Sequence, residues 1–116
     1  MTLEDINTML EELNIPVAYN HFNESIAPPY AVYYVVASDN TVADDQVYTE
    51  NVTINIELYT AVKDLVLEKQ LKDILNQNDL PYEQISETYI ENDNVYEILF
   101  EITIMGLEYD SRPMSI

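Results

Sequence analysis

The chain has 116 residues, of which 22 are acidic and 4 are lysine or arginine, so its formal charge is −18 at pH 7. This length suits one domain with a single core, the 47% hydrophobic content is too high for a disordered chain, and the scarcity of basic residues disfavours direct binding to nucleic acid or anionic membranes. Cysteine is absent, which excludes disulfides and thiolate metal sites and is typical of a protein made in a reducing cytoplasm.

The N-terminal segment is predicted to form a helix followed by a short strand. Thr2 and Asp5 have the spacing of a capping box, and apolar residues recur at helical spacing over residues 3–13. Val17–Phe22 alternates as a short strand would. Pro28 and Pro29 then interrupt regular structure, so we expect a connecting segment before the next element.

Two strands separated by an acidic segment are predicted next. Tyr30–Ser38 is apolar on both of its faces, which is typical of a central strand covered on both sides, or of a strand covered on one side and completed by a partner. Asp39–Gln46 is polar and acidic without periodicity, and we expect it to be a long loop between antiparallel strands. Val52–Tyr59 alternates strictly between apolar and polar residues, which predicts a strand with one buried face.

The C-terminal half is predicted to contain a helix and a hairpin. Asp64 is suited to cap the start of a helix whose apolar positions run from Leu67 to Leu75. Tyr82–Glu91 is expected to be the next strand, and Asn92–Asn94 has the composition of a hairpin turn. Val95–Met105 alternates as the last strand.

The element order α-β-β-β-α-β-β predicts an α+β fold. We expect a four- to five-stranded mixed, mostly antiparallel sheet with two helices on one face. Gly106, the single glycine, ends the last strand. Residues 1–106 would form one domain, and residues 107–116 an irregular C-terminal arm.

The sheet face without helices is expected to be rich in tyrosine and carboxylate. Its predicted residues are Tyr33, Val35, Thr53, Glu57, Tyr59, Glu97, Leu99 and Glu101. Because monomers seldom expose large apolar patches, such a face suggests an assembly surface. The alternative is that the first helix or the C-terminal arm covers this face, and the sequence leaves both open.

Residues for catalysis are scarce. With one glycine, the chain contains neither a dinucleotide-binding loop nor a P-loop, and the nucleophile elbow is also missing. His21 is the only histidine, which favours a structural role over a metal site. The segment Asp39–Asp45 lacks the glycine and one oxygen ligand of a calcium loop. We therefore expect no enzyme activity, cofactor or metal.

Five segments resemble small proteins encoded in the structural gene clusters of long-tailed phages and prophages of Gram-positive bacteria. They are Met1–Ile6, Asn14–Phe22, Pro28–Tyr34, Val52–Thr60 and Tyr96–Ile102, and the resemblance spans residues 1–105. Such proteins look like siphophage tail-terminator, or tail-completion, proteins. The shared motifs are patterns of apolar and aromatic residues, so the resemblance concerns the fold and carries no catalytic residue.

The resemblance implies a virion structural protein. Its family forms a homo-oligomeric ring, usually a hexamer, on the head-proximal end of the tail tube, where it stops tube growth and joins the tail to the head. The implied partners are further copies of the chain, the tail tube protein and the head completion or connector protein. DNA would pass through an acidic ring without specific binding. The expected locations are the host cytoplasm during assembly and then the head–tail junction of the virion, with no membrane involved.

Interface residues are proposed from physical arguments, because mobile segments often become ordered on assembly. They come from the predicted open face, the Asp39–Glu50 loop and the C-terminal arm: Tyr33, Asp39, Asp44, Asp45, Tyr48, Tyr59, Glu97 and Arg112. The alternative function is a small acidic DNA mimic that inhibits a host nuclease or restriction system. That function requires carboxylates at phosphate-like spacing, whereas organised strands with an apolar face favour the ring.

Overall fold

The part of the chain that the structure describes forms two helices and a five-stranded sheet, in the predicted order. The computed structural model describes residues 1–43 and 47–108, and for residues 39–43 and 47–49 it describes the backbone alone. Along the chain, the elements are α1 (Leu3–Glu11), β1 (Val17–Tyr19), β2 (Tyr30–Ala43), β3 (Val47–Thr60), α2 (Leu65–Gln77), β4 (Tyr82–Ile90) and β5 (Val95–Ile104).

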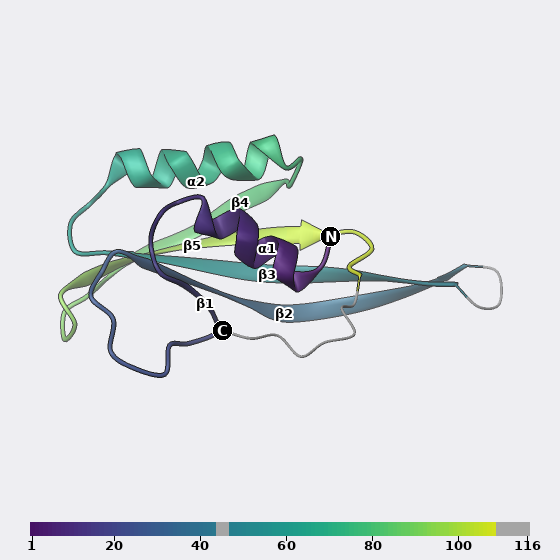
Figure 1. The fold of residues 1–116 in the computed structure, drawn as a ribbon, viewed down its shortest axis with the longest axis horizontal. Coiled ribbons are helices and arrows are strands. Elements are labelled where there is room, and N and C mark those ends of the chain that lie inside the picture. Colours follow the sequence, from purple (N-terminus) through teal and green to yellow (C-terminus); the bar gives the residue numbers. More distant parts are fainter. Residues whose placement is uncertain (44–46, 109–116) are drawn as a thin grey trace.

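The sheet has the strand order β1-β2-β3-β5-β4, and both helices pack on the same face (Figure 1). β1 runs parallel to β2, whereas the other neighbouring pairs are antiparallel. The core contains Leu10 from α1, Leu71 and Leu75 from α2, and Ile56 and Phe100 from the central strands, all fully buried. The predicted mixed α+β sheet is confirmed.

Both helices begin at the residues that the sequence suggested. The backbone N–H of Asp5 donates to Thr2 Oγ1 at 3.1 Å, and the Asp5 carboxylate accepts from the backbone N–H of Thr2 at 2.8 Å. At the second helix, Asp64 Oδ1 accepts from the backbone N–H of Leu67 at 3.0 Å. These side chains satisfy N–H groups that a helix cannot pair internally.

The predicted acidic loop is wrong for residues 39–43, which belong to β2. Their backbone pairs with β3 up to Ala43 opposite Val47, and only residues 44–46 between the strands lie outside the described part. The last pair that joins β3 to β5 is Val52 opposite Ile104. Beyond this pair, the β2–β3 hairpin continues by itself and projects past the helices (Figure 1). Strand pairing needs only backbone hydrogen bonds, so a segment without apolar alternation can still form a strand.

The predicted face of Tyr33 is also wrong. Tyr33 pairs with Ile56 across β2 and β3, so its side chain points toward the helices and is fully buried. Its hydroxyl donates to Asn7 Oδ1 of α1 at 3.0 Å. The sequence does not show which face of Tyr30–Ser38 points to the core, because both faces are apolar. The register with β3 decides it.

The remaining differences lie at the ends of elements. α1 ends at Glu11 instead of residue 13, and β1 ends at Tyr19 instead of Phe22. Leu107 is buried, and its backbone N–H donates to the Glu50 carbonyl at 2.8 Å, so the chain stays attached to the domain beyond Gly106. Within residues 1–43 and 47–108, no helix is both long and apolar enough to cross a membrane.

Candidate functional site

The face of the sheet opposite the helices forms a surface of tyrosines and carboxylates, which we call the open face. The register places Tyr30 beside Tyr59 and Val32 beside Glu57, and it continues from Tyr59 to Glu97 on β5. The open face comprises Tyr30, Val32, Tyr34, Thr53, Asn55, Glu57, Tyr59, Glu97, Leu99 and Glu101. α1 packs on the opposite face, so the alternative in which this helix covers the open face is excluded.

Two tyrosines and two glutamates form a hydrogen-bonded cluster on the open face. The Tyr34 hydroxyl donates to Glu57 Oε2 at 2.8 Å. The Tyr59 Oη lies 2.9 Å from Glu57 Oε1 and 2.8 Å from Glu97 Oε2. A tyrosine hydroxyl carries one proton. Tyr59 therefore donates to one of its two carboxylates at a time, and the other contact joins two oxygens without a proton between them.

The carboxylates and partial burial hold the neighbouring tyrosines in their neutral form. Burial and then the hydrogen bonds to Glu97 and Glu57 raise the pKa of Tyr59 well above its ordinary value. Burial raises the pKa of Tyr30, and the negative charges of Asp93 and Glu57 raise it further. The hydroxyls of this face therefore remain hydrogen-bond donors at neutral pH.

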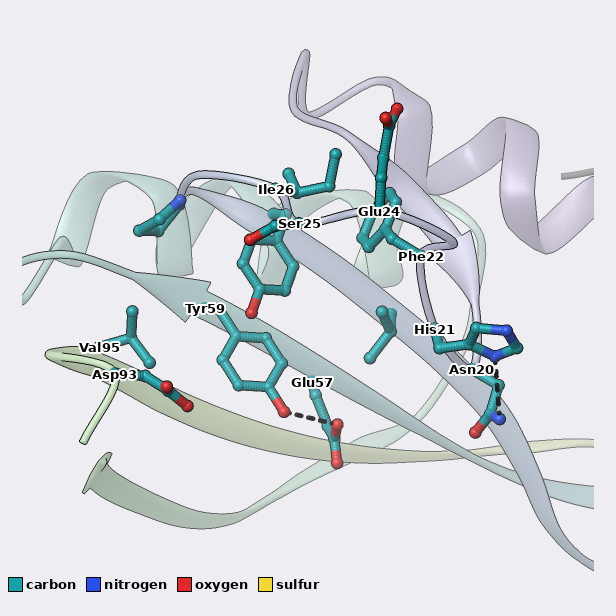
Figure 2. Close-up of a pocket in the computed structure, with 13 residues that line it drawn as sticks. Asn20, His21, Phe22, Glu24, Ser25, Ile26, Glu57, Tyr59, Asp93 and Val95 are labelled. Carbon is teal, nitrogen blue, oxygen red and sulfur yellow. Dashed lines mark hydrogen bonds between the residues drawn. The ribbon is translucent and has the colours of Figure 1, made fainter. Parts of the chain in front are cut away.

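A pocket of about 480 Å³ lies where the segment after β1, residues 20–29, folds over one end of the open face (Figure 2). Its wall contains three rings in a row. Phe22 meets Tyr30 edge to face at 5.5 Å between ring centroids, and Tyr30 stacks on Tyr59 at 4.8 Å. The pocket is lined by Asn20, His21, Phe22, Glu24, Ser25, Ile26, Pro28, Tyr30, Val32, Glu57, Tyr59, Asp93 and Val95.

The charged groups of the pocket are unevenly placed. Glu57 and Asp93 lie on either side of Tyr59, whereas the Glu24 carboxylate extends away from that ring (Figure 2). His21 lies beside Asn20, on the far side of the pocket from Asp93 (Figure 2). The imidazole Nδ1 lies 3.4 Å from the Asn20 side-chain nitrogen, and no hydrogen bond joins the imidazole to a carboxylate in the described part of the chain, so the arrangement offers no acid–base pair. Among the described residues, no group of three or more histidines and carboxylates is placed to hold a metal ion.

Two of the eight proposed interface residues meet in this cluster. Tyr59 and Glu97 lie within hydrogen-bond distance of each other, whereas Tyr33 is in the core. The other five are outside the described part of the chain or are described there by backbone alone: Asp39, Asp44, Asp45, Tyr48 and Arg112. The proposed interface set missed Tyr30, Tyr34 and Asp93, because periodicity shows neither which face of β2 is buried nor that the β4–β5 turn approaches this pocket. It also omitted Glu57, although the alternation of β3 places Glu57 on the predicted open face.

We expect stability to fall steeply above pH 10 and the Tyr59 hydroxyl to contribute to that loss. Because folding raises the pKa of Tyr59 above its ordinary value of 10.0, its stabilising effect is complete below pH 10 and is lost as the pH rises further. The loss is at most about 1.4 kcal/mol per pH unit for one tyrosine. Urea unfolding measured at increasing pH should therefore give a shallower decline for Tyr59→Phe than for the unmodified protein.

The control for this prediction is Phe22→Leu, which reduces the aromatic contact in the same pocket without removing an ionisable group. Its free energy of unfolding should differ from that of the unmodified protein by a constant amount at every pH. Identical alkaline slopes for the unmodified protein and Tyr59→Phe would contradict a raised pKa at Tyr59.

Comparison with known proteins shows the fold alone. No family model matches the chain, and no curated protein matches it. A solved structure of a protein whose name states no function has a TM-score of 0.52 and 14% sequence identity, over 97% of this chain and 99% of that chain. At this identity, the similarity extends to an α+β arrangement that covers the whole length of both chains.

Proposed function

We propose that this chain is a tail-terminator, or tail-completion, protein of a long-tailed phage. In this role, copies of the chain form a ring on the head-proximal end of the tail tube and join the tail to the head. The observation that carries the proposal is the open face, a sheet surface with half-buried tyrosines and Leu99 that neither helix covers. The sequence resemblance described above supports the same role.

The shape of the subunit suits a ring. Closed rings form when one surface of a subunit binds a different surface of the next. Here the open face and the projecting β2–β3 hairpin are separate surfaces of one molecule that measures 51 × 27 × 24 Å. We propose that the hairpin of one copy contacts its neighbour, while the open face is available to the tail tube or to the head completion protein.

The charge fits a ring through which DNA passes. Each copy carries a formal charge of −18, so an assembled ring would repel the DNA backbone instead of retaining it. The proposed location is therefore the head–tail junction of the virion. The second hypothesis, a DNA mimic, relies on the same charge and is tested by the same genetic experiment.

The experiment is to inactivate the gene in its phage or prophage and to examine the induced particles by negative-stain electron microscopy. A tail terminator predicts DNA-filled heads without attached tails, together with tails of irregular or excessive length. Particles of normal form and tail length would refute this function. In that case, a host nuclease that binds the purified protein and is displaced by DNA would favour the mimic.

Complementation with variants then tests the role of the open face. Leu99→Arg places a charge in the centre of that face and is expected to fail to restore joined particles. Val66→Arg makes the same change in charge on α2, where Val66 is 70% exposed, and is expected to restore them. Equal restoration by both variants, with both proteins folded, would show that the open face is not needed for assembly.

A further inference from the structure

The pocket at the end of the open face has the aromatic wall of a cation site. Phe22, Tyr30 and Tyr59 form a continuous row of rings along it, and the Tyr30 and Tyr59 rings stack at an angle of 18° between their planes. Aromatic faces attract cations through the negative potential of the ring. The stacked Tyr30 and Tyr59 rings cover each other's inner faces, so a cation that enters this pocket would have to meet an outer face of the row.

The carboxylates of the pocket have no cationic partner in the described part of the chain. Glu57 and Asp93 both line it, and no lysine or arginine is among its lining residues. Lys63 pairs with Glu68 and Glu87, and Lys69 pairs with Asp73 on α2. The negative charge beside Tyr30 and Tyr59 is therefore available to a ligand.

The Tyr59 cluster lacks a hydrogen-bond donor. Three contacts of 2.8 to 2.9 Å join Tyr34, Tyr59, Glu57 and Glu97, but the two hydroxyls supply only two protons. When Tyr59 donates to Glu97, Glu57 Oε1 receives no proton from Tyr59, and a ligand donor that approaches from the pocket can donate to Glu57 instead. This observation does not depend on the aromatic wall, and it favours a ligand that carries a hydrogen-bond donor.

We propose that this pocket binds an arginine side chain presented by a partner protein. A guanidinium is planar, stacks on aromatic faces, and offers five N–H donors in a fork that matches a carboxylate. The volume of about 480 Å³ lies within the range of pockets that enclose a small ligand. The proposal goes beyond the ring and does not rest on it, because any basic partner could supply the arginine.

The geometry favours a protein over a free small molecule. The pocket shares Tyr30, Val32, Glu57 and Tyr59 with the open face, so a chain whose arginine fills the pocket can continue along the sheet. A partner with net positive charge complements the carboxylates of both surfaces. The chain itself has 22 acidic and only 4 basic residues, so a different, basic protein is the partner that complements this pocket.

The test is a titration of the ¹⁵N-labelled full chain with three capped tripeptides that differ only in their central residue, Gly-Arg-Gly, Gly-Lys-Gly and Gly-Gln-Gly. The arginine peptide should give saturable shifts of the amide signals of Tyr30, Val32, Tyr59 and Val95. The lysine peptide should bind more weakly because an ammonium cannot form the fork. The glutamine peptide should cause no saturable shift.

Variants separate the pocket from the general acidity of the protein. Asp93→Asn and Tyr30→Leu should each weaken arginine binding by about threefold. Asp93 is exposed in the β4–β5 turn, where asparagine is also accommodated, so the first variant is expected to fold normally. Glu83→Gln, the matched control, removes one charge near the other end of β4 and should leave binding unchanged.

Three results would overturn the proposal. Equal shifts with the arginine and glutamine peptides would show that no cation is recognised. Equal affinity for arginine and lysine would contradict recognition of a guanidinium. A loss with Glu83→Gln as large as the loss with Asp93→Asn would assign the binding to overall charge. Failure of the genetic experiment, by contrast, would refute the ring and leave these three results unaffected.

Discussion

Replacing Phe100 with alanine is expected to lower the free energy of unfolding by about 3–5 kcal/mol. Phe100 is fully buried in β5, between β3 and β4, and its ring lies 5.9 Å from that of Tyr82. Removing the ring reduces the apolar surface that folding buries and leaves a cavity between the sheet and the helices. Since a domain of this size is stable by only about 5–15 kcal/mol, the variant should unfold at much lower urea concentration.

The measurement is urea unfolding followed by far-ultraviolet circular dichroism. Met105→Ala is the control, because it also shortens a large apolar side chain but at a residue that is 75% exposed. That variant should change the free energy by less than about 0.5 kcal/mol. Similar losses for both variants would contradict the position of Phe100 in a packed core.

Replacing Lys63 with methionine is expected to cost about 2–3 kcal/mol. Lys63 Nζ lies 2.9 Å from Glu68 Oε1 and 2.8 Å from Glu68 Oε2, and the Glu68 side chain is only 4% exposed. The variant leaves the Glu68 carboxylate buried without its cation. The expected cost is below that of a fully buried pair because Lys63 is itself 36% exposed, so solvent screens part of the interaction.

Lys69→Met provides the matched control, since Lys69 pairs with Asp73 at the surface of α2, the helix that also carries Glu68. Its cost should be about 0.3–0.5 kcal/mol. The double variant Lys63→Met/Glu68→Met should recover most of the stability, because an apolar pair needs no counter-charge. If the double variant is less stable than Lys63→Met alone, the loss does not come from an unpaired carboxylate.

Six residues form the Tyr59 cluster or carry the argument for the pocket beside it: Tyr30, Tyr34, Glu57, Tyr59, Asp93 and Glu97. Only two of them were in the proposed interface set. Tyr59 and Glu97 were chosen because strict alternation in β3 and β5 fixes which side chains share a face. The predicted position of Tyr33 on the open face implies the opposite face for Tyr30 and Tyr34, and the composition of Asn92–Asn94 predicts only a turn for Asp93. Three of these six residues, Tyr30, Tyr34 and Asp93, therefore depended on register and on contacts between distant segments.

The sequence by itself determined the local features of this protein. Thr2 and Asp64 cap the helices because a cap acts within one turn of its own residue. The alternation in Val52–Tyr59 and Val95–Met105 predicted strands with one buried face, and these strands form the centre of the sheet. Such patterns are readable because the repeat of a strand or helix is a property of the backbone alone.

The tertiary structure decided everything that depends on which surfaces meet. The burial of Tyr33 follows from the register between β2 and β3, because both faces of β2 are apolar and neither is marked for the core. The length of the hairpin follows from backbone pairing that its polar composition does not reveal. The pocket forms only where residues 20–29 approach β3 and the β4–β5 turn, since distant segments become neighbours only through folding.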